Sequence, residues 1–264
     1  MTSKYQSQVL DHLGLVAAMY EELGIGAVID HAIVQDATKR TVSLGQAVKA
    51  MVLNGLGFVN QQLYLVPSFF HNKPTERLIG PGIEAAHLND DVLGRALEAL
   101  YGYGVPPLYT LIAAQAAQRL ALTGRLAHLD TTSCHVDGRY NSAAAPDDQI
   151  MHITPGDSRD HRPDLNHVML ALIVDQHAGI PLRMKPRSGN THDQVACGRI
   201  IAEHVQQLRT AHSLPYLVAD SALYTAQNLG HWAQSGIKWI TRVPGTLTEV
   251  HAVLARVTPE IMTP

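Results

Sequence analysis

Hydrophobic positions in the first part of the chain recur at the three- and four-residue spacing that is typical of amphipathic helices. This spacing predicts one helix over residues 10–23, with Gly24 and Gly26 as its stop. A second helix is predicted directly after Ser43, whose hydroxyl is suited to cap it, and Gly57 lies near its end. The amino-terminal part of the chain is therefore expected to be helical.

Two more helices are predicted before residue 124. Asn89 is placed to cap one of them, and Asp90 and Asp91 follow in the first turn, where carboxylates favour the exposed N–H groups. The other is an alanine-rich segment over residues 108–122, behind a loop around Pro106 and Pro107. An all-helical module of about five helices is expected, of a size that fits DNA-end binding, dimerisation or a scaffold.

Beyond Gly124 the pattern changes to short runs rich in β-branched residues. Strands are predicted over residues 126–132, 167–175, 182–185, 216–219 and 237–242, and helices over 193–210 and 226–235. The polar segment 138–166 is expected to be an exposed loop. This order predicts an α/β (mixed α+β) core with a mixed sheet, so we expect two domains, 1–124 and 125–264.

Composition limits the classes of protein that fit. The 264 residues are 46% hydrophobic and 16% charged, which is enough apolar material for packed domains and excludes a disordered tail. The net charge of −3 does not favour nucleic acid, so any DNA contact must come from local patches. Cys134 and Cys197 form no disulfide scaffold, and no apolar run approaches the length of a membrane span. A cytoplasmic protein is expected.

Two predicted strands run into an aspartate, at Asp130 and at Asp220. If these strands pair, the carboxylates converge at the edge of the sheet where ligands of open α/β folds gather. Two carboxylates there are suited to hard cations such as Mg²⁺, and a two-metal site would act on a phosphodiester. The alternative is that each aspartate only caps a turn.

Basic and polar residues between these aspartates are candidates for DNA contact. Arg159 and Arg162 can clamp a phosphate, and Asn166 completes the block before the strand 167–175. A solvated loop with balanced charges is the alternative for this segment. A second basic run is also open to two interpretations. It could contact DNA, or its charges could only keep the strand of a hairpin soluble. Its members are Arg183, Lys185 and Arg187.

Several motifs together resemble a known family. HLDTT, GDSRDHRPDLNHVMLALIVD, GIPL, SGNTHD, YLVADSALYT and WITRVP are similar to segments of the IS4-superfamily DDE transposases, and within them of the IS1634-type group. LDHLGLVAAMYEELGIGAVID and LNDDVLGRALEALY resemble the helical domain that precedes the catalytic core in that family. The resemblance extends over nearly all of the chain.

The resemblance implies an RNase H-like core in which Asp130 is the first and Asp220 the second catalytic, metal-binding aspartate. It implies Mg²⁺ (or Mn²⁺) as cofactor and double-stranded DNA, both element ends and target, as partner. Hydrolysis at the ends of an insertion element would be followed by attack of the freed 3′-hydroxyl on target DNA. A homo-oligomer and no membrane partner are expected.

The third acid of the family is a glutamate in a Y…R…E…K arrangement on a later helix. Glu249 and Glu260 are the only acids after Asp220, and neither has that context. We therefore expect a core that is incomplete at its C-terminus, and little or no strand transfer by this chain alone. The alternatives are a noncatalytic DNA-binding or dimerisation fragment of a transposase, and an unrelated metal-dependent phosphoesterase.

Overall fold

The computed structural model describes residues 7–36, 40–58, 62–138, 140, 151–156, 162, 164–176, 179–191, 216–236 and 238–257. The chain divides into two compact units, Met1–Ala121 and Leu122–Pro264, where the pattern predicts a division after residue 124. The helix predicted over residues 193–210 lies outside the described residues. Within the described ranges, no helix combines the length and the apolar character needed to cross a membrane.

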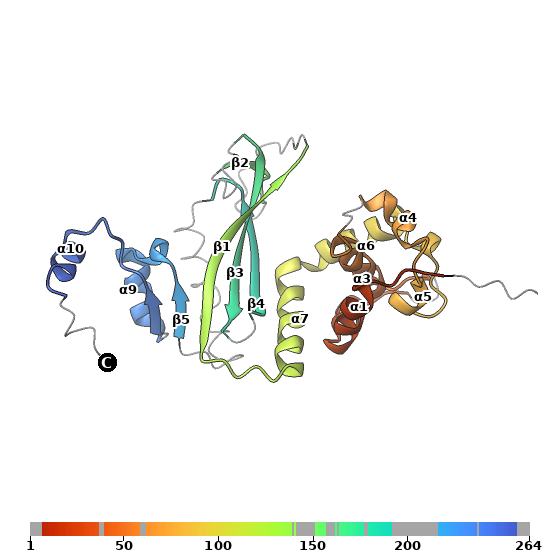
Figure 1. Ribbon diagram of the computed structural model, residues 1–264, viewed down its shortest axis with the longest axis horizontal. Coiled ribbons are helices and arrows are strands. Elements are labelled where there is room, and N and C mark those ends of the chain that lie inside the picture. The colour runs from red at the N-terminus through yellow and green to blue at the C-terminus, as the bar shows by residue number, and fades with distance from the viewer. Residues whose placement is uncertain are drawn as a thin grey trace, which may run out of the picture. The chain divides into compact units, whose positions relative to one another are not determined.

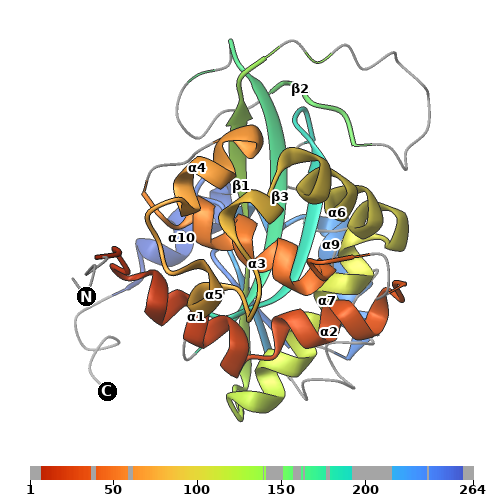
Figure 2. The ribbon, with the colours of Figure 1, turned by 90° about the vertical axis from the view of Figure 1, so that its right-hand side faces the viewer.

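The first unit consists of helices (Figure 1). They are α1 (Leu13–Glu22), α2 (Ile25–Ala32), α3 (Leu44–Gly55), α4 (Val66–Phe70), α5 (Thr75–Leu78), α6 (Asp90–Tyr103) and α7 (Val105–Arg119), with 3₁₀ turns η2 (Leu63–Leu65) and η3 (Ala85–His87). Helix α3 lies in the middle and contacts α1, α2, α4 and α6 (Figure 2). Its buried residues therefore form the centre of the hydrophobic core of this unit.

Local chemistry sets where these helices begin. The Ser43 hydroxyl accepts from the Gln46 N–H at 3.1 Å, and the Gln46 side chain accepts from the Ser43 N–H at 2.9 Å, which completes a capping box. The Asn89 side chain accepts from the Val92 N–H at 3.0 Å at the start of α6. Both predicted N-caps are confirmed, since each satisfies an N–H group that the helix leaves unbonded.

Two glycines with positive φ separate consecutive helices. Gly24, with φ +70°, ends α1, as predicted, but α2 then begins at once and was not anticipated. Gly104, with φ +101°, separates α6 from α7. The loop predicted around Pro106 and Pro107 is wrong, because both prolines lie in the first turn of α7, where a missing N–H costs no hydrogen bond.

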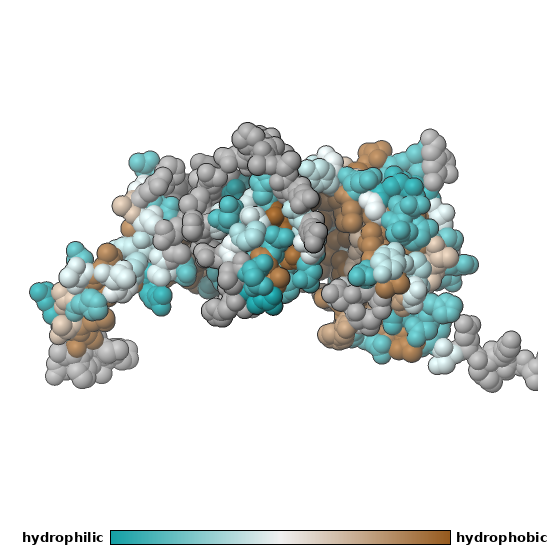
Figure 3. All heavy atoms as spheres, turned by 90° about the horizontal axis from the view of Figure 1, so that it is seen from above, coloured by the Kyte–Doolittle hydropathy of each residue, from teal (hydrophilic) through white to brown (hydrophobic). Residues whose placement is uncertain are grey.

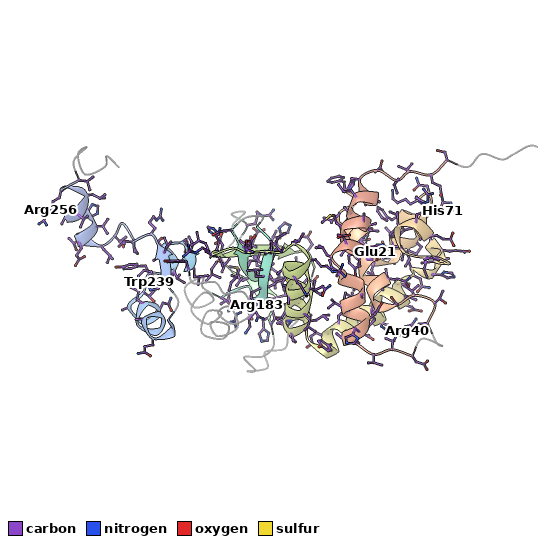
Figure 4. The ribbon with its side chains drawn as sticks, turned by 90° about the horizontal axis from the view of Figure 1, so that it is seen from below. Glu21, Arg40, His71, Arg183, Trp239 and Arg256 are labelled. Carbon is purple, nitrogen blue, oxygen red and sulfur yellow. The ribbon has the colours of Figure 1, made fainter. Side chains whose placement is uncertain are left out.

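A buried charge lies inside the helical unit. Lys49 on α3 is only 3% exposed, and its Nζ is 2.6 Å from the Oε1 of Glu21, whose side chain reaches solvent (Figure 4). The Tyr20 hydroxyl next to it donates to the Gly45 carbonyl at 2.8 Å, and burial raises the pKa of Tyr20. Glu21 therefore supplies the negative charge that makes burial of Lys49 tolerable.

The second unit contains one mixed sheet. Its strands are β1 (Leu126–Val136), β2 (Thr154–Pro155), β3 (Asn166–Asp175), β4 (Pro181–Ser188), β5 (Tyr216–Ala219) and β6 (Lys238–Thr241). A 3₁₀ turn η4 (Ser221–Leu223) and α9 (Ala226–Ser235) connect β5 to β6, and α10 (Thr248–Leu254) follows β6. Strand β2 lies inside the segment predicted to be a loop, and it pairs with the beginning of β3.

The order of the strands identifies the fold. From one edge to the other the strands run β4, β3, β1, β5, β6. Strands β4 and β1 are both antiparallel to β3, which lies between them. Strands β1, β5 and β6 are parallel to one another. This order and these directions are those of the RNase H-like core that the sequence predicts, so that expectation is confirmed. β1 is the central strand (Figure 1).

The two faces of the sheet differ in burial. On β3 every second residue is buried, and two of the β1 residues that pair with them, Ala127 and Leu129, are buried as well. The alternate residues, which include His128 and Asp130, lie on the other face, and those two are exposed. We refer to the face of Leu129 as the inner face and the face of Asp130 as the outer face.

We expect Glu21→Gln to lower the free energy of unfolding of the helical unit by about 1–3 kcal/mol, because it leaves the buried Lys49 ammonium without a charged partner. Urea denaturation followed by circular dichroism at 222 nm measures this loss. Glu22→Gln is the matched control, since Glu22 is exposed on the same helix, and it should stay within about 0.5 kcal/mol of the wild type. Equal loss in both variants would contradict the assignment.

Candidate active site

The two candidate aspartates lie side by side on neighbouring strands. Leu129 on β1 pairs with Ala219 on β5, and Asp130 and Asp220 are the residues that come next. Since paired strands lie about 4.8 Å apart, the two aspartates are brought to the same place at the carboxyl edge of β5. The structure therefore gathers the two residues that the sequence singles out.

Asp130 does not end its strand. The strand predicted over residues 126–132 is too short, because β1 continues to Val136. Strand β5 ends at Ala219, but β3 goes on pairing with β1 as far as the pair Val136 and Asn166, so the backbone of β1 keeps a partner. Asp130 therefore lies in mid-strand, exposed, with its Oδ1 2.8 Å from the N–H of Thr131.

Asp220 is held through its backbone. Its carbonyl accepts from the N–H of Leu223 at 3.3 Å, which closes η4, and from the hydroxyl of Thr241 at 2.5 Å. Thr241 is the last residue of β6, so this hydrogen bond joins the ends of β5 and β6. The carboxylate itself is exposed. Two neighbouring strands thus fix the position from which the Asp220 side chain extends.

Arg242 lies at the same edge. It follows Thr241, which pairs with Ala219, and its Nη2 donates to the Ser221 hydroxyl at 3.2 Å. In the part of the chain that the structure describes, no carboxylate lies within ion-pair distance of this guanidinium. Sequence reasoning gave Arg242 no role, although it belongs to the WITRVP motif, because the pairing of β5 with β6 was needed to place it beside Asp220.

The donor set fits a hard divalent cation. Two adjacent exposed carboxylates offer the oxygen ligands that Mg²⁺ and Mn²⁺ prefer. Among the described ranges, no group of three or more histidine, cysteine, aspartate or glutamate side chains is placed to hold a metal. Asp130 and Asp220 could together offer carboxylate oxygens to such an ion.

Of the candidates for DNA contact near β3, Asn166 lies far from Asp130. Arg159 lies outside the described residues. Asn166 pairs with Val136, six residues along β1 from Asp130, which corresponds to about 20 Å. Its Nδ2 donates to the Gly138 carbonyl at 3.3 Å. The structure places Asn166 at the far end of β1 and β3, the end to which β2 is joined (Figure 2).

Arg162 already has a bidentate partner. Its Nε and Nη2 donate to the two carboxylate oxygens of Asp164 at 2.8 and 2.7 Å. Hydrogen bonding to Arg162 lowers the pKa of the Asp164 carboxyl to about 2. Both side chains are exposed, so the pair contributes little to stability. A phosphate would have to compete with Asp164 for the same two donors.

The basic run on β4 lies on the inner face. Arg183 pairs with Ile173, Lys185 with Ala171 and Arg187 with Met169. Ile173 is also the partner of Leu129, and Ala171 and Met169 alternate with it on β3, so all three pairs lie on the inner face. Arg183 is only 7% exposed, and burial lowers its pKa (Figure 4). The structure therefore separates these three cations from Asp130 by the thickness of the sheet.

A bulge explains this placement. Val174 pairs with Pro181, but Ile173 pairs with Arg183, so Leu182 is an extra residue in β4. Without it Arg183 would pair with Leu172, which is the partner of Asp130 on the outer face. One added residue reverses which side chains of a strand face each way. The bulge therefore moves the basic run to the inner face.

The aspartate pair lies at the carboxyl edge of β5 in an RNase H-like sheet, and two family models match parts of the chain. Residues 147–252 match the family model "Transposase DDE domain". Asp220 lies inside the matched range and Asp130 lies before it. Residues 5–114, most of the helical unit, match "Domain of unknown function (DUF4277)". No curated protein matches the sequence.

Similar solved structures include transposases in complex with DNA. The piggyBac transposase synaptic complex with hairpin DNA is 13% identical with a TM-score of 0.36, and covers 91% of this chain and 45% of its own. The Mos1 mariner paired-end complex with Mn is 11% identical with a TM-score of 0.31, covering 92% and 72%. The Mos1 paired-end complex with the left transposon end is 10% identical with a TM-score of 0.30, covering 80% and 62%. Because these TM-scores are low, the fold is assigned from the order and directions of the strands. The chain spans less than half the length of the piggyBac protein.

We expect Arg162→Gln to raise the pKa of Asp164 from about 2 to near its usual value of 3.8, because the variant removes both hydrogen bonds to the carboxylate. The stabilisation from this pair is present above pH 3.8 and is lost as the pH falls toward 2. A carbon-detected NMR titration of the Asp164 carboxyl measures the shift. Arg256→Gln is the control, and an unchanged Asp164 pKa in Arg162→Gln would refute the pairing.

Proposed function

We propose that this chain is a DNA transposase of the IS1634-type group of the IS4 superfamily, acting on the phosphodiesters at the ends of an insertion element. The observation that carries the proposal is the pairing of Leu129 with Ala219, which brings Asp130 and Asp220 together at the carboxyl edge of the sheet. The match of residues 147–252 to the transposase DDE domain supports it. So do the motifs shared with that group.

Asp130 and Asp220 would hold Mg²⁺ or Mn²⁺ through their carboxylate oxygens. A bound divalent ion lowers the pKa of a water molecule and offsets the negative charge that develops on a phosphate under attack. The role of the protein is to fix the two carboxylates, one through the double pairing of β1 and the other through the hydrogen bond from Thr241. Their exposed position leaves room for a DNA strand.

Arg242 would bind the phosphate beside these carboxylates. Its guanidinium has five N–H donors, and the Ser221 hydroxyl accepts from Nη2. Donors left over in a planar fork match the oxygens of a phosphate group. Arg242 would thus hold the scissile phosphodiester against the carboxylate pair while a water oxygen attacks phosphorus and the P–O3′ bond breaks. The freed 3′-hydroxyl would then attack target DNA.

Two carboxylates hold a metal ion less firmly than three, so we propose weak cleavage by residues 1–264 acting alone. Double-stranded DNA, as element ends and as target, is the proposed partner, and a homo-oligomer is the proposed assembly, because two ends must be brought together. The Mos1 transposase structure is a paired-end complex. The competing function is a noncatalytic DNA-binding or dimerisation fragment of a transposase.

We expect slow nicking of a labelled duplex that carries the element ends, dependent on Mn²⁺ or Mg²⁺. Asp130→Asn and Asp220→Asn should each reduce its rate by more than about 100-fold, because each removes a charged metal ligand. Denaturing gel electrophoresis measures the nicked strand. Asp137→Asn is the matched control, since Asp137 is an exposed aspartate just past the far end of β1, and it should nick like the wild type.

A readout apart from activity separates the two functions. Fe²⁺ bound in place of Mg²⁺ reduces added hydrogen peroxide to hydroxide and a hydroxyl radical, which cuts nearby polypeptide. We therefore expect cuts next to Asp130 and Asp220 that both asparagine variants lose. Salt-sensitive DNA binding without nicking and without these cuts would establish the noncatalytic fragment instead. Nicking that survives in both variants would place the active site elsewhere.

We expect Arg242→Gln to reduce the rate of nicking by about 10- to 100-fold, since it removes charged hydrogen bonds to a phosphate in the site. Arg242→Lys should recover part of the rate, because it restores the charge without the planar fork. Arg256→Gln makes the same charge change beyond α10, apart from β6 and Trp239 (Figure 4), and should leave the rate unchanged. Equal rates in the Arg242→Gln and Arg256→Gln variants would remove Arg242 from the site.

A further inference from the structure

The helical unit contains a groove of about 740 Å³ outside the site described above. It is formed by the segment after α2, the first half of α3, and the segment from η3 into α6. Both Arg40 and Arg95 line it, from segments that are far apart in the sequence. Arg40 lies at the periphery of the helical unit (Figure 4). The groove therefore collects two cations from different elements.

These two arginines carry charge that the described part of the chain does not neutralise. Both side chains are exposed, and among the described residues neither forms a hydrogen bond or an ion pair. Lys49, in contrast, is paired with Glu21 inside the same unit. Asp36 is the carboxylate in the lining, and it is already engaged in another contact. The groove thus presents two guanidinium groups for an external anion.

The rest of the lining suits a ligand with both charged and apolar parts. Val34, at the rim, is 91% exposed, and Val42 and Ala96 form part of the wall. Hydrophobic and hydrophilic side chains are interspersed on the surface of the helical unit (Figure 3). Ser43 and Asn89, the N-caps of α3 and α6, also line the groove. Asp30 already accepts from the Ser43 hydroxyl and the Gly45 N–H, and Asp90 and Asp91 lie in the first turn of α6, so the positive charge of the groove comes from the two arginines.

We propose that this groove binds the phosphate backbone of double-stranded DNA, with Arg40 and Arg95 as the residues that bind phosphate. Phosphates accept bidentate hydrogen bonds from arginine, whereas deoxyribose offers an apolar surface to side chains such as Val34. The proposal rests on the proposed function, which supplies DNA as the ligand and leaves the helical unit without a role. An acidic peptide shares the charge, but the transposase DDE domain of this chain favours DNA over it.

The test measures binding of residues 1–264 to a fluorescent 30-base-pair duplex by anisotropy, between 50 and 200 mM salt and in EDTA. We expect Arg40→Gln with Arg95→Gln to weaken binding by at least about 10-fold at low salt. The slope of log K against log salt should fall in magnitude by about 1.8, or about 0.9 for each phosphate that the variant no longer neutralises. The matched control is Arg77→Gln with Arg119→Gln, since both residues are exposed in the same unit and lie outside the groove.

The outcomes are distinct. Wild-type affinity and slope in the Arg40 and Arg95 double variant, or equal losses in the control, would overturn the proposal. So would a double variant that keeps DNA binding and loses binding of poly-glutamate, because the partner would then be an acidic protein. An unchanged melting temperature shows that the variant is folded. Binding is measured in EDTA, where no metal-dependent cleavage takes place, so failure of the groove and failure of the cleavage site give different results.

Discussion

The double pairing of β1 is the constraint on which the second unit depends. This strand hydrogen-bonds to β3 along one side in the antiparallel direction, and to β5 along the other in the parallel direction, over a much shorter length. Leu129 is fixed by both neighbours, so the next residue, Asp130, cannot move without breaking a ladder. The candidate site therefore lies beside a strand that is paired on both sides, although its side chains are exposed to solvent.

Local signals made much of the fold predictable. Ser43 and Asn89 cap helices because their side chains accept from N–H groups two or three residues ahead, which depends only on neighbouring sequence. The strand Asn166–Asp175 alternates in burial without interruption, and its hydrophobic run was recognisable. Pro106 and Pro107 were misjudged because proline breaks a helix in its interior but fits its first turn. Proline thus disfavours a helix at one position and favours it at another, and the hydrophobic pattern does not distinguish the two positions.

The candidate site was predictable in part. Asp130 and Asp220 each follow a short run of mostly apolar residues, and their convergence required only that the two strands pair in parallel. Arg242 was missed because its place depends on β6 joining β5, and on a hydrogen bond to Ser221 from a distant part of the sequence. The spacing of Arg183, Lys185 and Arg187 was plain, but the face on which they lie depends on pairing with β3. Long-range register, rather than local preference, decides such positions.

The extra residue at Leu182 has a consequence for how this sheet tolerates change over time. Loops at the ends of strands can grow or shrink with little effect, but a single codon deleted here would exchange the two sides of an edge strand. Three cations would turn toward the carboxylates, and Met184 would turn away from them. Lineages that inherit this core are thus expected to vary the side chains of β4 more readily than its length.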